Sequence, residues 1–272
     1  LPISRGLAGA ATLALAAMAA GNVLISNYTS ATQYQYLRIG IPDFDQARDG
    51  LPNNGLCHCY PTSVMNILSY AANHGMPTLP PGTTNYGLPE NYDEMTTLLG
   101  GLGSLMQVSP GGGLPCGTGG SAAMNGTLAF LGEAADQLTI VALAGNGAFL
   151  PTDNFIALLA SHPWTPLFRM GWGRYTIRRG QGSGHFPAVT RSNGHLVTFA
   201  SGVRNATESF VLYRDPGQGG SIFTQSDYVY NRAETTNLQF EFTVGGGFQT
   251  RTVTVLDFSP AQTVGIRIVD NI

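Results

Sequence analysis

The strongest structural signal in this chain is the run Cys57-His58-Cys59-Tyr60-Pro61-Thr62-Ser63-Val64-Met65-Asn66-Ile67-Leu68. Apolar residues recur in and just after it at helical spacing, so the run predicts an amphipathic helix over residues 59–75. Pro61 suits the first helical turn, where a missing N–H costs no hydrogen bond. Gly75 is a natural residue to follow the end of a helix, and His74 suits its last turn. Cys59 is therefore expected at the N-terminal end of a helix of about four turns.

A cysteine in that place is a candidate nucleophile. A thiol attacks as the thiolate, and its ordinary pKa of about 8.5 leaves little thiolate at neutral pH. The positive end of a helix dipole and a neighbouring imidazolium both favour the charged form. The predicted helix supplies the first of these to Cys59. Taken alone, a buried cysteine is more often a small apolar core residue, so the interpretation depends on a histidine partner.

Two later segments offer that partner and an acid to orient it. Residues 196–203 and 209–213 are β-prone and flank a polar turn at 204–208, so they predict a hairpin. Folding the chain at this turn makes His195 and Asp215 cross-strand neighbours. A carboxylate in that place holds the tautomer and orientation of an imidazole. His185 competes as the base, but no acidic residue lies at a matching hairpin distance from it. The remaining histidines are expected to be structural: His58, His74 and His162.

Together these segments resemble the bacteriocin-processing double-glycine peptidase family and its secreted relatives, within the papain-like cysteine peptidases. The family pattern is a glutamine, a Cys-Gly-Pro-Thr-Ser run that opens a helix, Gly-His before a strand, and Asp-Pro after the next. The matching positions are Gln46, Cys59 to Ser63, Gly194-His195 and Asp215-Pro216, with Tyr60 where the family usually has glycine. The resemblance implies an α+β, papain-like fold over residues 40–220. An N-terminal helical part would then pack its nucleophile helix on an antiparallel sheet.

The same resemblance implies that Gln46 donates to the oxyanion. Acyl transfer needs preformed donors where negative charge develops, and the Gln46 amide with the Cys59 backbone N–H would serve. Asn53 is the alternative donor, although Asn53-Asn54-Gly55 is also an ordinary turn.

The composition of the chain excludes several classes of function. Only 11% of the 272 residues are charged, which favours an extracytoplasmic protein, and a net charge of −3 argues against nucleic-acid binding. The basic residues are all arginine, which excludes a Walker A loop and a lysine Schiff base. No G-x-S-x-G motif is present. No cofactor is expected.

The ends of the chain carry further expectations. Residues 1–20 contain an apolar run behind Arg5 that is typical of a secretory signal, with a retained anchor or assembly helix as the alternative. The run is too short for a confident membrane span. Residues 21–39 are expected as an extended lead-in, 91–135 as a helical connector with a glycine-rich loop, and 221–272 as additional β-strands or a small extra sheet.

The cysteine count is odd, and an exported chain meets an oxidising compartment. If Cys59 must stay free to react, the pair left is Cys57 with Cys116, and the alternative is that all three stay reduced. Metal binding by Cys57, Cys59 and a nearby histidine is disfavoured, because structural zinc prefers a different cysteine spacing and a second pair.

Two functions remain. The first is a secreted cysteine peptidase or related amide-bond hydrolase that acts on a peptide or protein, with Cys59, His195, Asp215 and Gln46 as its catalytic residues. The second is a non-enzymatic surface or fibre subunit that retains the fold and self-assembles through its apolar N-terminus. Fold alone does not separate them.

Overall fold

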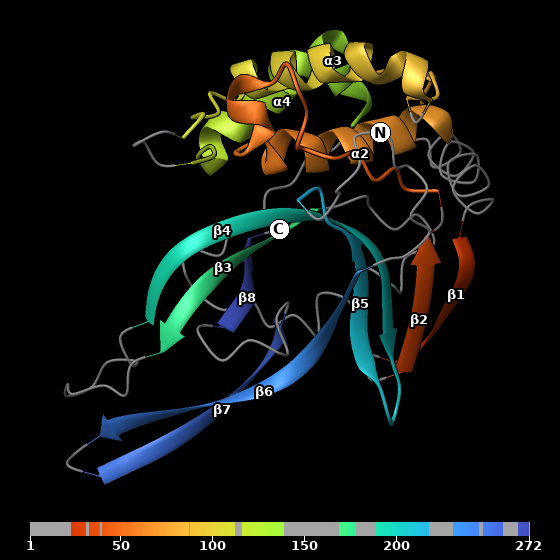
Figure 1. Cartoon of the computed structure of the whole chain (residues 1–272). Coiled ribbons are helices and arrows are strands. Elements are labelled where there is room, and N and C mark those ends of the chain that lie inside the picture. Colours follow the sequence, from red (N-terminus) through yellow and green to blue (C-terminus); the bar gives the residue numbers. More distant parts are fainter. Residues whose placement is uncertain are drawn as a thin grey trace, which may run out of the picture.

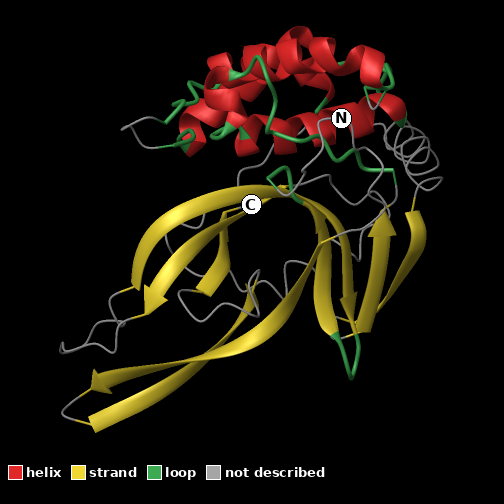
Figure 2. Ribbon diagram, viewed as in Figure 1, coloured by secondary structure: helices red, strands yellow, loops and turns green. Residues whose placement is uncertain are grey.

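The computed structural model describes residues 23–30, 33–38, 40–86, 88–111, 116–138, 169–177, 189–217, 231–244, 247–257 and 266–271. In these residues a group of helices lies over one side of a large antiparallel sheet (Figures 1 and 2). The predicted α+β class is therefore confirmed. The expectations for residues 1–20, His162 and His185 fall outside the described residues.

The helical layer is built from α2 (Cys59–Asn73), α3 (Tyr92–Leu105) and α4 (Gly120–Leu131). Short 3₁₀ turns flank them: η1 (Pro52–Gly55), η2 (Pro89–Asn91) and η3 (Gly132–Gln137). α2 begins at Cys59, where the sequence predicts, and His74 is its C-cap. The apolar faces of the helices meet in a core whose fully buried members include Met65, Met95, Leu99, Leu102 and Met106.

Within the described ranges, eight strands form the sheet in the order β1-β2-β4-β3-β8-β7-β6-β5, and β5 also pairs with β4. The six strands from β3 to β8 therefore close on themselves, while the β1–β2 hairpin extends from β4. The strands are β1 (Val23–Ser30), β2 (Gln33–Arg38), β3 (Arg169–Ile177), β4 (Val189–Arg204), β5 (Ser209–Arg214), β6 (Asn231–Val244), β7 (Gly247–Asp257) and β8 (Ile266–Asn271).

β4 is the central strand of this arrangement. Its first part pairs with β3, from Ile177↔Val189 to Arg169↔Thr198. Its last part pairs with both β2 and β5. α2 lies mainly on the same strand, so β4 forms most of the contact between that helix and the sheet (Figure 1).

Two segments outside the expected core of the fold also join the sheet. Residues 23–38 lie within the expected extended lead-in and form the β1–β2 hairpin, whose second strand pairs with β4. Local sequence does not show this pairing, because strand partners distant in the chain are selected by burial and register. The C-terminal strands β6 to β8 join the main sheet through β5 and β3 and do not form a separate one.

Candidate active site

Buried polar contacts hold α2 against β4. The hydroxyl of Ser63 donates to the carbonyl of Leu196 over 3.0 Å, and the hydroxyl of Thr198 donates to the carbonyl of Ser63 over 3.2 Å. The amide of Asn66 donates to the Thr198 hydroxyl and accepts from the backbone N–H of Phe44. Because buried polar groups are costly to leave unpaired, this network fixes the first turns of α2 beside the part of β4 that precedes Thr198.

Cys59 is the first residue of α2 and the free cysteine of the chain. Its side chain is partly exposed, unlike that of its neighbour Tyr60, which is buried. A thiolate here lies at the end of the helix where unpaired backbone N–H groups and the helix dipole favour negative charge. Cys59 therefore has the accessibility and the local field that a nucleophile needs.

His195 and Asp215 are brought into contact by the predicted hairpin. The β4–β5 pairing ends at Thr198↔Arg214, so the two strands deliver His195 and Asp215 just beyond its last pair. Nε2 of His195 lies 2.5 Å from Oδ1 of Asp215. The same carboxylate oxygen accepts the backbone N–H of Gly217 over 2.9 Å. The carboxylate is thus held in place by its own turn while it orients the imidazole.

The electrostatics of His195 link it to the nucleophile. Burial alone would lower the pKa of His195, but hydrogen bonds to Asp215 and Cys59, with the charges of both, raise that pKa from 6.5 to about 10. Since Asp215 occupies Nε2, Nδ1 is the nitrogen left for the thiol. The raised pKa favours the imidazolium form of His195 at neutral pH, in contact with Asp215 and in interaction with Cys59.

Gln46 is tied to both halves of the site. Its backbone N–H donates over 2.9 Å to the carbonyl of Pro216, the residue that follows Asp215. Its side-chain Nε2 donates to the carbonyl of Leu56 over 3.0 Å, which also identifies Nε2 as the atom on that side of the amide. An amide nitrogen has two N–H groups, so one remains for an oxyanion.

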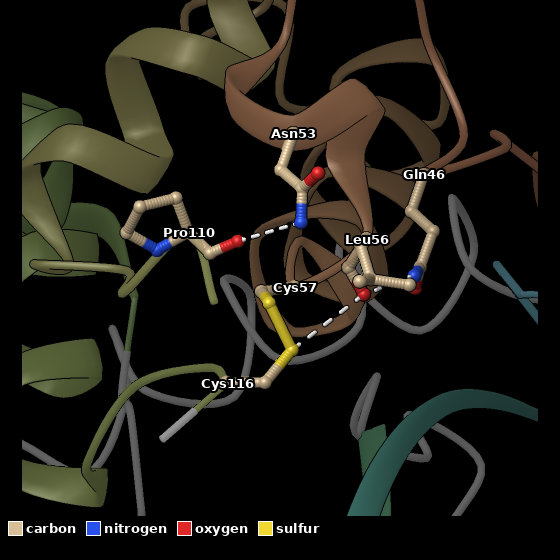
Figure 3. The surroundings of a disulfide bond; sticks show 6 residues. All are labelled: Gln46, Asn53, Leu56, Cys57, Pro110 and Cys116. Carbon is tan, nitrogen blue, oxygen red and sulfur yellow. Dashed lines mark hydrogen bonds between the residues drawn. A yellow bond between two sulfur atoms is a disulfide. The ribbon is translucent and has the colours of Figure 1, made fainter. Parts of the chain in front are cut away.

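Asn53, the alternative donor, has a different role in the structure. Its Nδ2 donates to the carbonyl of Pro110 over 3.0 Å (Figure 3). Asn53 and Asn54 both have positive φ, near 50°, as expected for a tight turn. The side chain of Asn53 therefore connects two loops, and Gln46 is the better candidate for the oxyanion donor.

The predicted disulfide is present. Cys57 is bonded to Cys116, with their Cα atoms 5.2 Å apart (Figure 3). The bridge fastens the residue two positions before Cys59 to the loop between α3 and α4. It leaves Cys59 as the remaining thiol, as the odd count predicts if one cysteine stays free.

The other described histidines have structural surroundings. His58 is buried, and a Cβ at Gly103 of α3 would lie 2.8 Å from its Nε2, so the ring packs directly on that helix. Burial lowers the pKa of His58. His74 caps α2, with Nδ1 2.6 Å from the carbonyl of Tyr70 and its ring stacked on the Tyr70 ring.

Sequence reasoning missed Arg48, which anchors the segment that carries Gln46. The guanidinium is buried, and it donates from Nε to the carbonyl of Asp45 and from Nη1 to the carbonyl of Tyr92 and the hydroxyl of Thr96. It also lies 4.5 Å above the centre of the Tyr92 ring. A buried arginine two positions from Gln46 has no local signature, since its contacts with Tyr92 and Thr96 come from a helix more than forty residues away.

Across the described ranges, no helix has the length and apolar character needed to cross a membrane. The same residues include no cluster of three or more His, Cys, Asp or Glu side chains suited to a metal ion. Comparisons of the chain with protein-family models, with curated proteins and with solved structures found no match in any of the three. The function of the chain is therefore inferred from the chemistry of its site.

Proposed function

We propose that this chain is an extracytoplasmic cysteine peptidase, or a related amide-bond hydrolase, with a papain-like arrangement of helices on a sheet. The observation that carries the proposal is one continuous set of contacts. A free cysteine at a helix N-terminus interacts with a histidine whose pKa is raised to about 10, and that histidine is bonded to an aspartate. Nucleophile, base and orienting acid in that order define a triad by their roles.

Each group has a defined step in the proposed reaction. The Cys59 thiolate attacks the carbonyl carbon of an amide, and negative charge develops on the carbonyl oxygen. The free N–H of Gln46 and the backbone N–H of Cys59 stabilise that charge. The His195 imidazolium then gives its proton to the leaving amine, and a thioester to Cys59 remains. Neutral His195 takes a proton from water, whose oxygen attacks the thioester and releases the acid and the thiolate.

Two observations support an oxidising location. The Cys57–Cys116 disulfide is of the kind that persists outside the cytosol, and the low charge content of the sequence agrees with that assignment. A peptide or protein is the proposed substrate, because amide bonds are the bonds that such a site is built to open.

The test is the rate at which Cys59 reacts with an amide-directed electrophile such as a peptidyl vinyl sulfone. We expect the native chain to react at neutral pH much faster than the urea-unfolded chain, with the adduct mapped to Cys59. We expect His195→Ala to react at about the rate of the unfolded chain. A native rate no faster than the unfolded rate would contradict the proposal and favour the non-enzymatic surface subunit.

A further inference from the structure

The carbonyl of Leu56 joins the candidate oxyanion donor to the disulfide. Gln46 Nε2 donates to this carbonyl oxygen over 3.0 Å, and the sulfur of Cys116 lies 3.8 Å from the same atom (Figure 3). Leu56 is also the residue directly before Cys57 in the chain. The Gln46 amide is therefore held by the peptide group between Leu56 and Cys57. The disulfide fixes that peptide group, because Cys57 is one of its two cysteines.

The loop around Leu56 is clamped on two sides. On one side Gly55 lies so close to Gln46 that a Cβ at Gly55 would be 1.7 Å from the Gln46 carbonyl oxygen. On the other side, the loop around Leu56 is joined to the loop between α3 and α4 by the Cys57–Cys116 bond and the Asn53–Pro110 hydrogen bond. That second loop is itself closed by paired backbone hydrogen bonds between Ser109 and Gly117.

We propose that the Cys57–Cys116 disulfide is a redox-dependent clamp that positions Gln46 for oxyanion stabilisation. Cys57 and Cys116 are thus positioning residues, and the inference rests on the proposed function of the same site. With the bridge formed, the Leu56 carbonyl holds one N–H of the Gln46 amide and aims the other at the oxyanion. Reduction by a dithiol transfers two electrons and two protons to the bridge, which gives two cysteine thiols and the oxidised form of the dithiol. Cys59 keeps its place on α2 and its contact with His195.

This clamp predicts a separation between two reactions of Cys59. Acylation by an activated ester passes through a tetrahedral intermediate with an oxyanion, so it needs the Gln46 donor. Alkylation by iodoacetamide is a displacement at a saturated carbon, and no oxyanion forms. Both reactions start from the same Cys59 thiolate, beside His195. Loosening the clamp should therefore slow the first reaction and spare the second.

The experiment compares the wild type with Cys57→Ser/Cys116→Ser, using a p-nitrophenyl ester of a blocked amino acid and, separately, iodoacetamide. We expect the double variant to lose at least about tenfold in kcat for the ester with little change in KM, and to keep its alkylation rate within about twofold. Gln46→Ala should lower ester kcat by about 10²-fold or more, since one oxyanion donor is removed. Adding Gln46→Ala to the double variant should cost little beyond Gln46→Ala alone, because coupled groups are not additive.

Three results would overturn the clamp: an unchanged ester rate in the double variant, an equal fall of both rates, or additivity with Gln46→Ala. Failure of the proposed function itself would look different, because the wild type would then show no acylation of Cys59. If the double variant does not fold, the disulfide of the wild type is reduced with a dithiol, and the dithiol is removed before the assays. Acylation and alkylation are then measured at Cys59 by peptide mapping, with the same expected separation and the same contradicting results.

Discussion

The backbone N–H of Gln46 donates to the carbonyl of Pro216, the residue that follows the orienting aspartate, over 2.9 Å. These residues are 170 positions apart by their numbers, yet this bond fixes the segment that carries Gln46 relative to the turn that carries Asp215. Arg214 reinforces the same junction, since its Nη1 lies 3.7 Å from Oδ2 of Asp43. The segment before α2 therefore lies against the end of β5 and the turn that follows it.

Removing either the nucleophile or the base should abolish amide or ester hydrolysis. We expect Cys59→Ala and His195→Ala to have no measurable turnover, and the double variant to be no worse than either, because the two act as a unit. Asp215→Asn should lose less than His195→Ala, since it misorients the base without removing it. Turnover of a p-nitrophenyl ester measures all four. His74→Ala, at the other end of α2, is the control and should keep its turnover; full activity in Cys59→Ala would end the peptidase proposal.

Because the pKa of His195 is raised, we expect the free energy of unfolding to fall as the pH becomes alkaline. The folded-state pKa is about 10, above the unfolded value of 6.5, so the stabilising contribution is complete below pH 6.5 and is lost as pH rises towards 10. The loss could reach a few kcal/mol, at about 1.4 kcal/mol per pKa unit. Urea unfolding between pH 6.5 and 10 measures it. Asp215→Asn should flatten this dependence, because it removes the hydrogen bond and charge that raise the pKa; parallel curves for the two proteins would contradict the assignment.

Gly55→Ala should displace the Gln46 segment. The new Cβ would lie 1.7 Å from the Gln46 carbonyl oxygen, which is impossible without backbone movement, and φ at Gly55 is +75°. Gly82→Ala is the matched control, since φ there is +86° but nothing lies within 4 Å of the added Cβ. We expect the control to lose about 1–2 kcal/mol from backbone strain alone and Gly55→Ala to lose clearly more. Equal losses in urea unfolding would show that the contact with Gln46 can relax at no cost.

Asn66→Leu should loosen α2 from the sheet. It leaves the buried N–H of Phe44 without an acceptor and removes the donor to Thr198, so we expect a loss of about 1–3 kcal/mol in the free energy of unfolding. Asn73→Ala, at the exposed end of the same helix, removes a bond to the Ser69 carbonyl and should cost less than about 1 kcal/mol. Similar losses in the two variants would mean that the network does not hold the helix.

Local pattern predicted the parts of the site that lie within one element or one hairpin. The apolar period after Cys59 located α2, because a helix buries one face at a spacing that is visible in the sequence. The turn at residues 204–208 located the pairing of His195 with Asp215, because a hairpin's register follows from its turn. The pairing of Cys57 with Cys116 was predicted on the condition that Cys59 stays free, and the structure has that pairing.

The tertiary structure alone decided what holds these parts together. The β1–β2 hairpin on β4, the closure of β3 to β8, and the burial of Arg48 against α3 all join segments distant in the chain. So does the hydrogen bond between the backbone N–H of Gln46 and the carbonyl of Pro216. Hydrophobic period and turn chemistry act over a few residues, so the sequence by itself determined the helix, the hairpin and the chemical types at their ends. Which distant surfaces meet depends on burying apolar area while pairing most of the buried polar groups, and both conditions are set by the whole folded chain.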